Sequence, residues 1–344
     1  MKNISYLIIL FATLGLFACS EDIMQEINNN PNNPADVASK FIITDVINST
    51  SFSVASGDFA FYASVYIEYN VGIYNQMYNA EVRLGEPSNA TTYNNTWNSV
   101  YTNLLQLKTI IAKCSEGGDE EGNTTVLGMA QILSAYNLAI LTDVMGDVPW
   151  TEALQPSVIW TPQLDKQEDI YRAVNKFIDD GIAHLEAETD FEEIEAQDPI
   201  FEGKADSWIK FAYGLKARYA MRMSKIAPNY DVVINAANNS FTNKSDEAIF
   251  TCSTSTIRNP FYLFFTDRNY FGASESLHNK LVSRNDPRDT IFFKPHPKAD
   301  ALHFAPNGKP EQRQDYYGIS ALAVASAPIY LMSFHELEFL KAEA

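Results

Sequence analysis

The run from Thr124 to Met145 is the segment that most constrains the fold, because it is apolar on nearly every side of a helix. Its small residues are Ala130, Ala135 and Ala139, and small side chains allow a second helix to approach closely. A chain built around such a run is expected to fold mainly from packed α-helices.

The stretch GDVPW, residues 146–150, ends that run abruptly. Gly146 suits the positive φ that a helix C-terminus favours, and Pro149 prevents the helix from resuming. We expect Asp147 to cap backbone N–H groups and Trp150 to cover the end of the preceding helix. These residues make a structural corner, and they need no catalytic role.

Apolar residues at helical spacing recur along most of the remaining chain, in segments 41–49, 59–69, 96–114, 169–186, 207–223 and 231–239. Two of these segments share a pattern. Trp97 and Leu104 are seven positions apart, as are Trp208 and Leu215, with apolar residues between them. Tetratricopeptide helices begin with this kind of spacing. The pattern predicts helical hairpins of that type.

The N-terminus carries signals for export. Residues 1–18 combine one lysine with an apolar run too short to span a membrane, which is typical of a signal peptide. The small residue before Cys19 resembles a bacterial lipobox, so Cys19 is the expected site of lipidation. The Asn- and Pro-rich residues up to 34 are expected to form a flexible tether. Residues 35–344 are then expected to form a single domain.

The charge balance excludes one class of partner. The chain has 43 acidic and 25 basic residues and a net charge of −18, whereas nucleic-acid binding needs a basic face. No GxGxxG, GxxxxGK[ST] or GxSxG motif is present, so nothing predicts nucleotide binding or esterase chemistry.

Neither the cysteines nor the histidines predict a metal site or a cofactor. Cys114 and Cys252 are compatible with pairing in an oxidising compartment, but nothing places them close together, and neither has CxxC spacing. We treat both as buried or unpaired. His296 and His303 share a Pro-broken basic loop, where a metal site lacks further support.

Several motifs occur in an order that resembles the SusD/RagB family of outer-membrane lipoproteins in Bacteroidetes. They are WNSVYTNLL, GDVPWTEAL, NDPRDTIFF, YYGIS and the terminal APIYLMSFHELEFLKAEA, together with the lipobox and tether. The resemblance implies tetratricopeptide-like hairpins packed against an irregular, loop-rich half with little β structure. It also implies that the protein acts at the cell exterior, as a lid that captures nutrients for a SusC-like TonB-dependent transporter. The acidic SEDI after the lipobox cysteine resembles the surface-export signal of these lipoproteins.

The resemblance also bears on the C-terminus. Family members usually continue beyond a point equivalent to Ala344, so this chain is expected to be incomplete there. The final helix is then expected to lack a packing partner and to expose an apolar stripe.

Two loop-like stretches offer the flat rings and the planar polar groups that bind sugars. In the family the ligand surface is built from such loops. The candidate residues in 66–95 are Tyr74, Asn75, Tyr78, Asn79, Arg83, Tyr93 and Asn94. Those in 256–271 are Arg258, Asn259, Tyr262, Arg268, Asn269 and Tyr270.

Two other classes of function remain open. One is a tetratricopeptide-type scaffold that binds only proteins. The other is a glycan-cleaving enzyme, for which the acidic run DFEEIEAQD would supply a carboxylate pair. Such a run is usually a solvated helix face, so we expect no enzyme activity.

In NDPRDTIFF, we expect Asp286, Arg288 and Asp289 to form an ion-pair corner that locks a turn.

Overall fold

A computed structural model describes residues 36–84 and 92–344. The predicted signal peptide, the tether and Cys19 lie outside the described residues. So does the segment 85–91, which belongs to the first predicted ligand-binding stretch. Residues Ser39–Ala344 form one compact unit.

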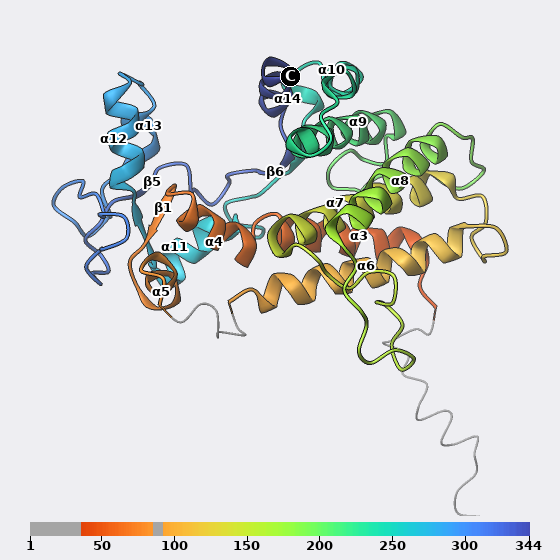
Figure 1. The fold of residues 1–344 in the computed structure, drawn as a ribbon, viewed down its shortest axis with the longest axis horizontal. Coiled ribbons are helices and arrows are strands. Elements are labelled where there is room, and N and C mark those ends of the chain that lie inside the picture. The colour runs from red at the N-terminus through yellow and green to blue at the C-terminus, as the bar shows by residue number, and fades with distance from the viewer. Residues whose placement is uncertain (1–35, 85–91) are drawn as a thin grey trace, which may run out of the picture. The chain divides into compact units, whose positions relative to one another are not determined.

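The described chain is mostly helical with small pieces of strand, which confirms the predicted fold class. Its α-helices are labelled in Figure 1 wherever there is room. They are α3 Ser39–Ser49, α4 Asp58–Tyr66, α5 Asn75–Glu81, α6 Asn94–Cys114, α7 Thr124–Met145, α8 Gln167–Leu185, α9 Ala205–Arg222, α10 Tyr230–Asn238, α11 Pro260–Arg268, α12 Glu275–Ser283, α13 Asp289–Phe292 and α14 Phe334–Glu343. A π-helical turn, Thr50–Val54, follows α3, and short 3₁₀ turns lie at Met223–Lys225 and Lys244–Asp246.

The helix α7 is the centre of the core. It packs against α6 on one side and α8 on the other, and every residue from Val126 to Ala139 is buried (Figure 1). In length and composition it could cross a membrane, but its burial among other helices is that of a core helix.

The closest approach between α7 and α8 depends on two glycines that the sequence analysis did not single out. A Cβ on Gly128 would lie 2.8 Å from the carbonyl oxygen of Gly181, and a Cβ on Gly181 would lie 2.9 Å from Ile132 Cγ1. The predicted small residues Ala130, Ala135 and Ala139 are fully buried, but glycine sets the spacing.

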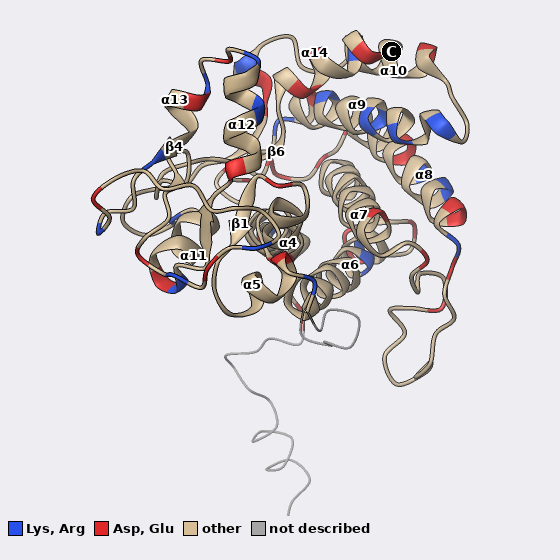
Figure 2. Cartoon of the chain, turned by 60° about the vertical axis from the view of Figure 1, so that its left-hand side comes forward, with Lys and Arg blue, Asp and Glu red and all other residues tan. Residues whose placement is uncertain are grey.

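The long helices after α7 pack beside one another in the order in which they occur in the sequence. Neighbouring pairs pack together, α8 against α9 and α9 against α10. Trp208 is fully buried, and its indole N–H donates to the Asp198 carboxylate at 2.7 Å. Trp97 is half-buried, with its ring 4.9 Å from that of Tyr101. Acidic and basic residues both occur on α8 and α9 (Figure 2), and Lys216 reaches from α9 to Asp179 on α8 at 2.6 Å.

The corner after α7 has the predicted structural character. Gly146 has a φ of 78°, and its N–H donates to the carbonyl of Thr142 at 2.8 Å. The Asp147 carboxylate accepts a 2.9 Å hydrogen bond from the backbone N–H of Gln167, the first residue of α8. Trp150 packs edge-on against Phe177 of α8, with ring centroids 5.8 Å apart.

Within residues 36–84 and 92–344, the strands form three antiparallel pairs. They are β1 Asn70–Gly72 with β3 Phe271–Ala273, β2 Ala248–Phe250 with β6 Ile329–Met332, and β4 Phe293–Lys294 with β5 Ile319–Ser320. Each pair joins segments far apart in the sequence. The β1–β3 and β4–β5 pairs connect segments of the irregular half, whereas Ala248, Leu331 and Met332 of the β2–β6 pair are part of the main helical core.

One loop prediction is wrong. The stretch 256–271 is not a loop, because α11 occupies Pro260–Arg268. The Asn259 side chain accepts from the N–H groups of Phe261 and Tyr262, Pro260 starts the helix, and Asn269 ends it in the left-handed conformation. These are standard start and stop signals that the aromatic and basic composition of the stretch obscured.

The prediction that the last helix lacks a packing partner is also wrong. The helix α14 packs against α9 and α10, and Leu337 is fully buried. Arg218 on α9 donates to both oxygens of Glu336 on α14, at 2.5 and 2.6 Å. Phe339 is 74 % exposed.

Both described cysteines are free and buried, as expected. Burial is the main cause that raises the pKa of Cys114, to about 11.

The ion-pair corner is confirmed for Arg288, which contacts Asp286 at 2.5 Å, whereas Asp289 pairs with His278 at 2.7 Å.

Candidate functional site

The pairing of β1 with β3 brings the two predicted ligand-binding stretches side by side. Val71 lies opposite Gly272 in the antiparallel register, and the Ile73 N–H donates to the Tyr270 carbonyl at 2.8 Å. Residues after β1 and before β3 therefore share one edge of the irregular half.

At this edge Tyr74, Asn75 and Tyr270 form a group. The rings of Tyr74 and Tyr270 have centroids 5.7 Å apart and planes inclined at 39°. The Asn75 amide donates to the Tyr270 hydroxyl at 3.2 Å. Tyr74 is 38 % exposed, so part of its face is open to solvent. Two flat rings beside a planar amide suit the C–H faces and hydroxyls of a sugar.

A second group follows the other end of α5. The Arg83 guanidinium lies over the ring of Tyr66, 4.2 Å from its centroid, and the hydroxyls of Tyr93 and Tyr66 are 3.4 Å apart. Tyr66 and Arg83 line a cavity of about 350 Å³. A guanidinium over an aromatic face makes a cation–π contact, and guanidinium groups also donate hydrogen bonds to ligands.

Glu81 lies in the wall of the same cavity. Its two carboxylate oxygens accept backbone N–H bonds from Gly72 at 3.1 Å and Gly308 at 2.5 Å. Burial is the largest effect on this carboxyl, and its pKa is raised although these hydrogen bonds act in the opposite direction. Glu81 thus fastens β1 and the 307–308 turn to α5.

The other predicted residues are more dispersed. Asn79, Asn94, Arg258 and Arg268 are exposed, and Tyr78, Tyr262 and Asn269 are half-buried. In the described chain, no hydrogen bond or ring contact joins Arg258, Tyr262 or Arg268 to Tyr74 or Tyr270. Asn259 is 93 % buried as the N-cap of α11, and its amide donates to the Ala327 carbonyl at 3.0 Å.

Sequence reasoning missed Tyr66 and Glu81. Tyr66 is the last residue of α4, where it is half-buried and reads as an ordinary apolar position of that helix. Glu81 looks like a solvated carboxylate at the end of a short helix. A local pattern shows neither role, because both depend on contacts with distant segments.

The acidic run 190–198 builds no carboxylate pair of the kind that glycosidases use. Glu192, Glu193 and Glu195 are exposed. Asp198 is buried, and its oxygens accept from the N–H groups of Ile200 and Gly203 and from the Trp208 indole. This carboxylate is committed to holding a turn.

In residues 36–84 and 92–344, no three His, Cys, Asp or Glu side chains gather as a metal ion would need.

Comparison with known proteins identifies the class of protein that has this fold. Residues 31–344 match the SusD-like_2 family model, described as "Starch-binding associating with outer membrane". The chain belongs to this SusD-like family, which is a family of binding proteins. No curated protein matches it.

Solved structures agree with the family assignment. A SusD/RagB family protein from Bacteroides thetaiotaomicron is 46 % identical with a TM-score of 0.84, over 90 % of this chain and 67 % of that one. A chitin-binding SusD homologue from Flavobacterium johnsoniae is 22 % identical with a TM-score of 0.71, over 89 % of this chain and 65 % of its own. A Bacteroidetes SusD-like protein is 20 % identical with a TM-score of 0.72, over 90 % and 72 %. The chain thus spans about two thirds of the length of these proteins.

Proposed function

We propose that this protein is a lipid-anchored binding protein of the outer membrane, which captures a glycan at the cell exterior without cleaving it. The ligand then passes to a SusC-like TonB-dependent transporter, on which the protein acts as a lid. The family description and the chitin-binding relative support the glycan as ligand.

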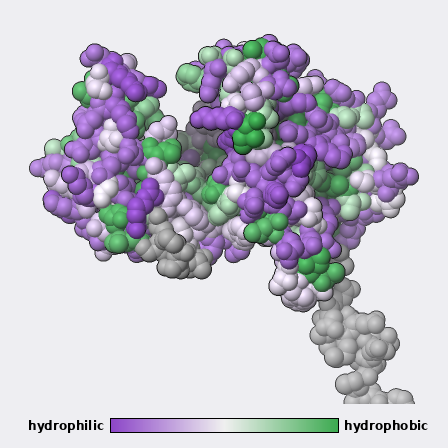
Figure 3. Space-filling model, in the orientation of Figure 1, coloured by the Kyte–Doolittle hydropathy of each residue, from purple (hydrophilic) through white to green (hydrophobic). Residues whose placement is uncertain are grey.

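One observation carries the proposal. Tyr74, Asn75 and Tyr270 come from the two stretches that composition alone marked as sugar-binding, and the fold brings them into contact. Hydrophilic residues cover most of the face drawn in Figure 3, and this face has no large apolar patch. Such a surface is suited to contact with a hydrated glycan. Binding then depends on a few rings and planar polar groups.

Capture needs only geometry and no covalent step. A sugar ring that lies on Tyr74 gains contact area with a stiff side chain, and its hydroxyls exchange water for the Asn75 amide. Arg83 and Tyr66 lie beyond the other end of α5, and they offer a second contact to a longer oligosaccharide.

The test is calorimetry with maltohexaose and chitohexaose on the full chain. We expect one of them to bind, and Tyr74→Ala or Tyr270→Ala to weaken binding about tenfold, which corresponds to ~1.4 kcal/mol for the loss of one stacking ring. The matched control is Tyr330→Ala, because Tyr330 is 51 % exposed on β6 and belongs to neither tyrosine group.

Three outcomes would contradict the proposal. Equal affinities of the Tyr74 and Tyr330 variants would remove the Tyr74–Tyr270 surface from the site. Absence of binding heat with both oligosaccharides would favour a protein-binding scaffold instead. Chromatography of the incubated oligosaccharides would also show shortened products if the protein were a glycosidase.

A further inference from the structure

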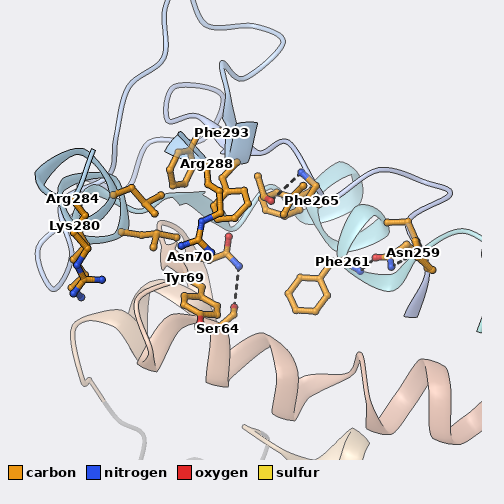
Figure 4. A pocket seen from close by; sticks show the side chains of 18 residues that line it. Ser64, Tyr69, Asn70, Asn259, Phe261, Phe265, Lys280, Arg284, Arg288 and Phe293 are labelled. Carbon is orange, nitrogen blue, oxygen red and sulfur yellow. Dashed lines mark hydrogen bonds between the residues drawn. The ribbon is translucent and has the colours of Figure 1, made fainter. Parts of the chain in front are cut away.

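A larger cavity, of about 690 Å³, lies among α11, α12, α13 and residues 320–328 (Figure 4). Most of its wall is apolar, with Phe261 and Phe265 from α11 and Leu277 and Leu281 from α12. Its size is in the range of small-molecule sites, which is roughly 300–1,000 Å³. None of the tyrosines of the proposed glycan surface lines it.

The helix α12 supplies both the apolar and the charged part of this wall. Leu277, Lys280, Leu281 and Arg284 follow one another at spacings of three, one and three residues, which places them on one face of a helix. All four line the cavity, and Arg288 adds a third cation from the turn before α13. The face is therefore apolar along one edge and basic along the other.

The charge of the cavity is opposite to that of the protein. The chain has a net charge of −18, yet the lining residues include three cations and no Asp or Glu. Lys280 contacts Glu68 at 2.7 Å, and Arg288 contacts Asp286 at 2.5 Å, both outside the cavity wall. Arg284 is exposed, its backbone N–H donates to the carbonyl of Leu281 at 3.1 Å, and its positive charge helps to lower the pKa of Asp286, after the larger effects of Arg288. Three cations therefore lie beside an apolar surface, and none of the residues that line the cavity is a carboxylate.

We propose that this cavity binds a small ligand that has one carboxylate and an apolar body. The carboxylate is held by Arg284, with Lys280 and Arg288 nearby, and the body packs against Leu277, Leu281 and Phe293, whereas Phe261 lies toward the other end of the cavity (Figure 4). Charge-assisted hydrogen bonds to a guanidinium are stronger than those between neutral groups, and the three cations are exposed beside the apolar wall, where a ligand carboxylate can reach them.

A hydrophilic anion fits the cavity less well. Ser64, Tyr69, Asn70 and Ser320 also line the cavity, but an acidic sugar such as glucuronate would still put several hydroxyls against phenylalanine and leucine side chains, where they lose their hydration. The site thus differs from the glycan surface in both place and ligand chemistry, and it goes beyond the proposed function.

The test measures binding to the full chain by calorimetry with three probes. They are 3-phenylpropionate, its neutral amide 3-phenylpropanamide, and glucuronate. We expect the carboxylate to bind about tenfold more tightly than the amide, since a hydrogen bond to a charged group is worth about that factor. Glucuronate is expected to bind more weakly than 3-phenylpropionate.

Matched variants assign the binding to the cavity. Arg284→Gln is expected to weaken 3-phenylpropionate binding about tenfold. Lys309→Gln removes one positive charge from an exposed position outside the cavity. We expect it to change the affinity less than about twofold, because salt screens the interaction between the ligand and a distant exposed charge. Leu322→Gln, at a 55 % exposed apolar wall position, is expected to weaken phenylpropionate binding while leaving the fold intact.

The proposal fails if 3-phenylpropionate does not bind at concentrations up to about 10 mM. It also fails if the amide or glucuronate binds as tightly as the carboxylate, or if Arg284→Gln behaves like Lys309→Gln. Thermal unfolding of each variant establishes that the compared proteins are folded. Tyr74→Ala should leave phenylpropionate binding unchanged, which separates this site from the glycan surface.

Discussion

Asp165, shortly before α8, holds the backbone of the corner after α7 through hydrogen bonds. Its carboxylate accepts from the N–H groups of Trp150 and Thr151, at 2.7 and 2.9 Å, and from the Thr151 hydroxyl at 2.8 Å. Burial, the largest effect, would raise the pKa of Asp165, but these hydrogen bonds outweigh it, and the pKa lies below its usual value. The ionised form is therefore the one that the fold stabilises.

Asp165→Asn is expected to lower the free energy of unfolding at pH 7 by about 1 kcal/mol, at the low end for such bonds because the group is partly solvated. Because the pKa is lower in the folded state, the contribution is complete above the unfolded value of ~3.9 and is lost as pH falls through the folded value. Urea unfolding at pH 7 and at acidic pH measures both. The control is Asp190→Asn, at an exposed position. A difference between Asp165→Asn and wild type that grows on acidification would refute this account.

At the scale of elements, the α7–α8 pair shows packing prevailing over helix propensity. Glycine costs a helix about 1 kcal/mol relative to alanine, yet both helices carry one at their contact. At Gly128 a Cβ would meet Leu185 Cγ at 2.6 Å and the backbone of Gly181 at 2.8 Å. Backbone does not yield to such a contact as a flexible side chain does, so the two helices would have to separate.

We therefore expect Gly128→Ala to destabilise the protein by about 1–3 kcal/mol, the usual cost of overpacking, despite the better propensity of alanine. Asn175→Ala, on an exposed position of α8, is the control and should change stability by less than about 0.5 kcal/mol. Thermal or urea unfolding gives both values. A Gly128→Ala protein as stable as wild type would mean that the helices lie farther apart than described.

At the scale of the whole molecule, the proposed lipid anchor would hold an acidic protein at the membrane. A chain with a net charge of −18 is repelled by anionic lipid headgroups, so an acyl chain on Cys19 would supply the membrane attachment. The family description places such proteins with the outer membrane.

Cys19→Ala is expected to abolish incorporation of radiolabelled palmitate and to release the protein from the outer-membrane fraction of cells that export it. Cys114→Ala is the matched control, because Cys114 is buried in the core and should not affect labelling. Protease added to intact cells should degrade the wild-type protein if it faces the exterior. Membrane retention of the Cys19 variant would argue against a lipid anchor.

The helices were predictable because their signals are local. The apolar pattern located the run Thr124–Met145 with the bounds that α7 has in the structure, and glycine and proline marked its end. The same kind of local signal, Asn259 before Pro260, was present for α11 but was masked by the aromatic and basic residues around it. Prediction failed there through competing interpretations rather than through lack of information.

By itself the sequence determined the helical class, the corner at Gly146, and two stretches rich in tyrosine and asparagine, since each depends on neighbours within a few residues. Only the tertiary structure decided which of those residues meet. Asn75 and Tyr270 are 195 positions apart and are joined through the pairing of β1 with β3. Similarly, the apolar and basic face of α12 becomes one wall of a cavity only when α11 and residues 320–328 pack beside it. Contacts of that range depend on the whole chain's packing, and no short segment encodes them.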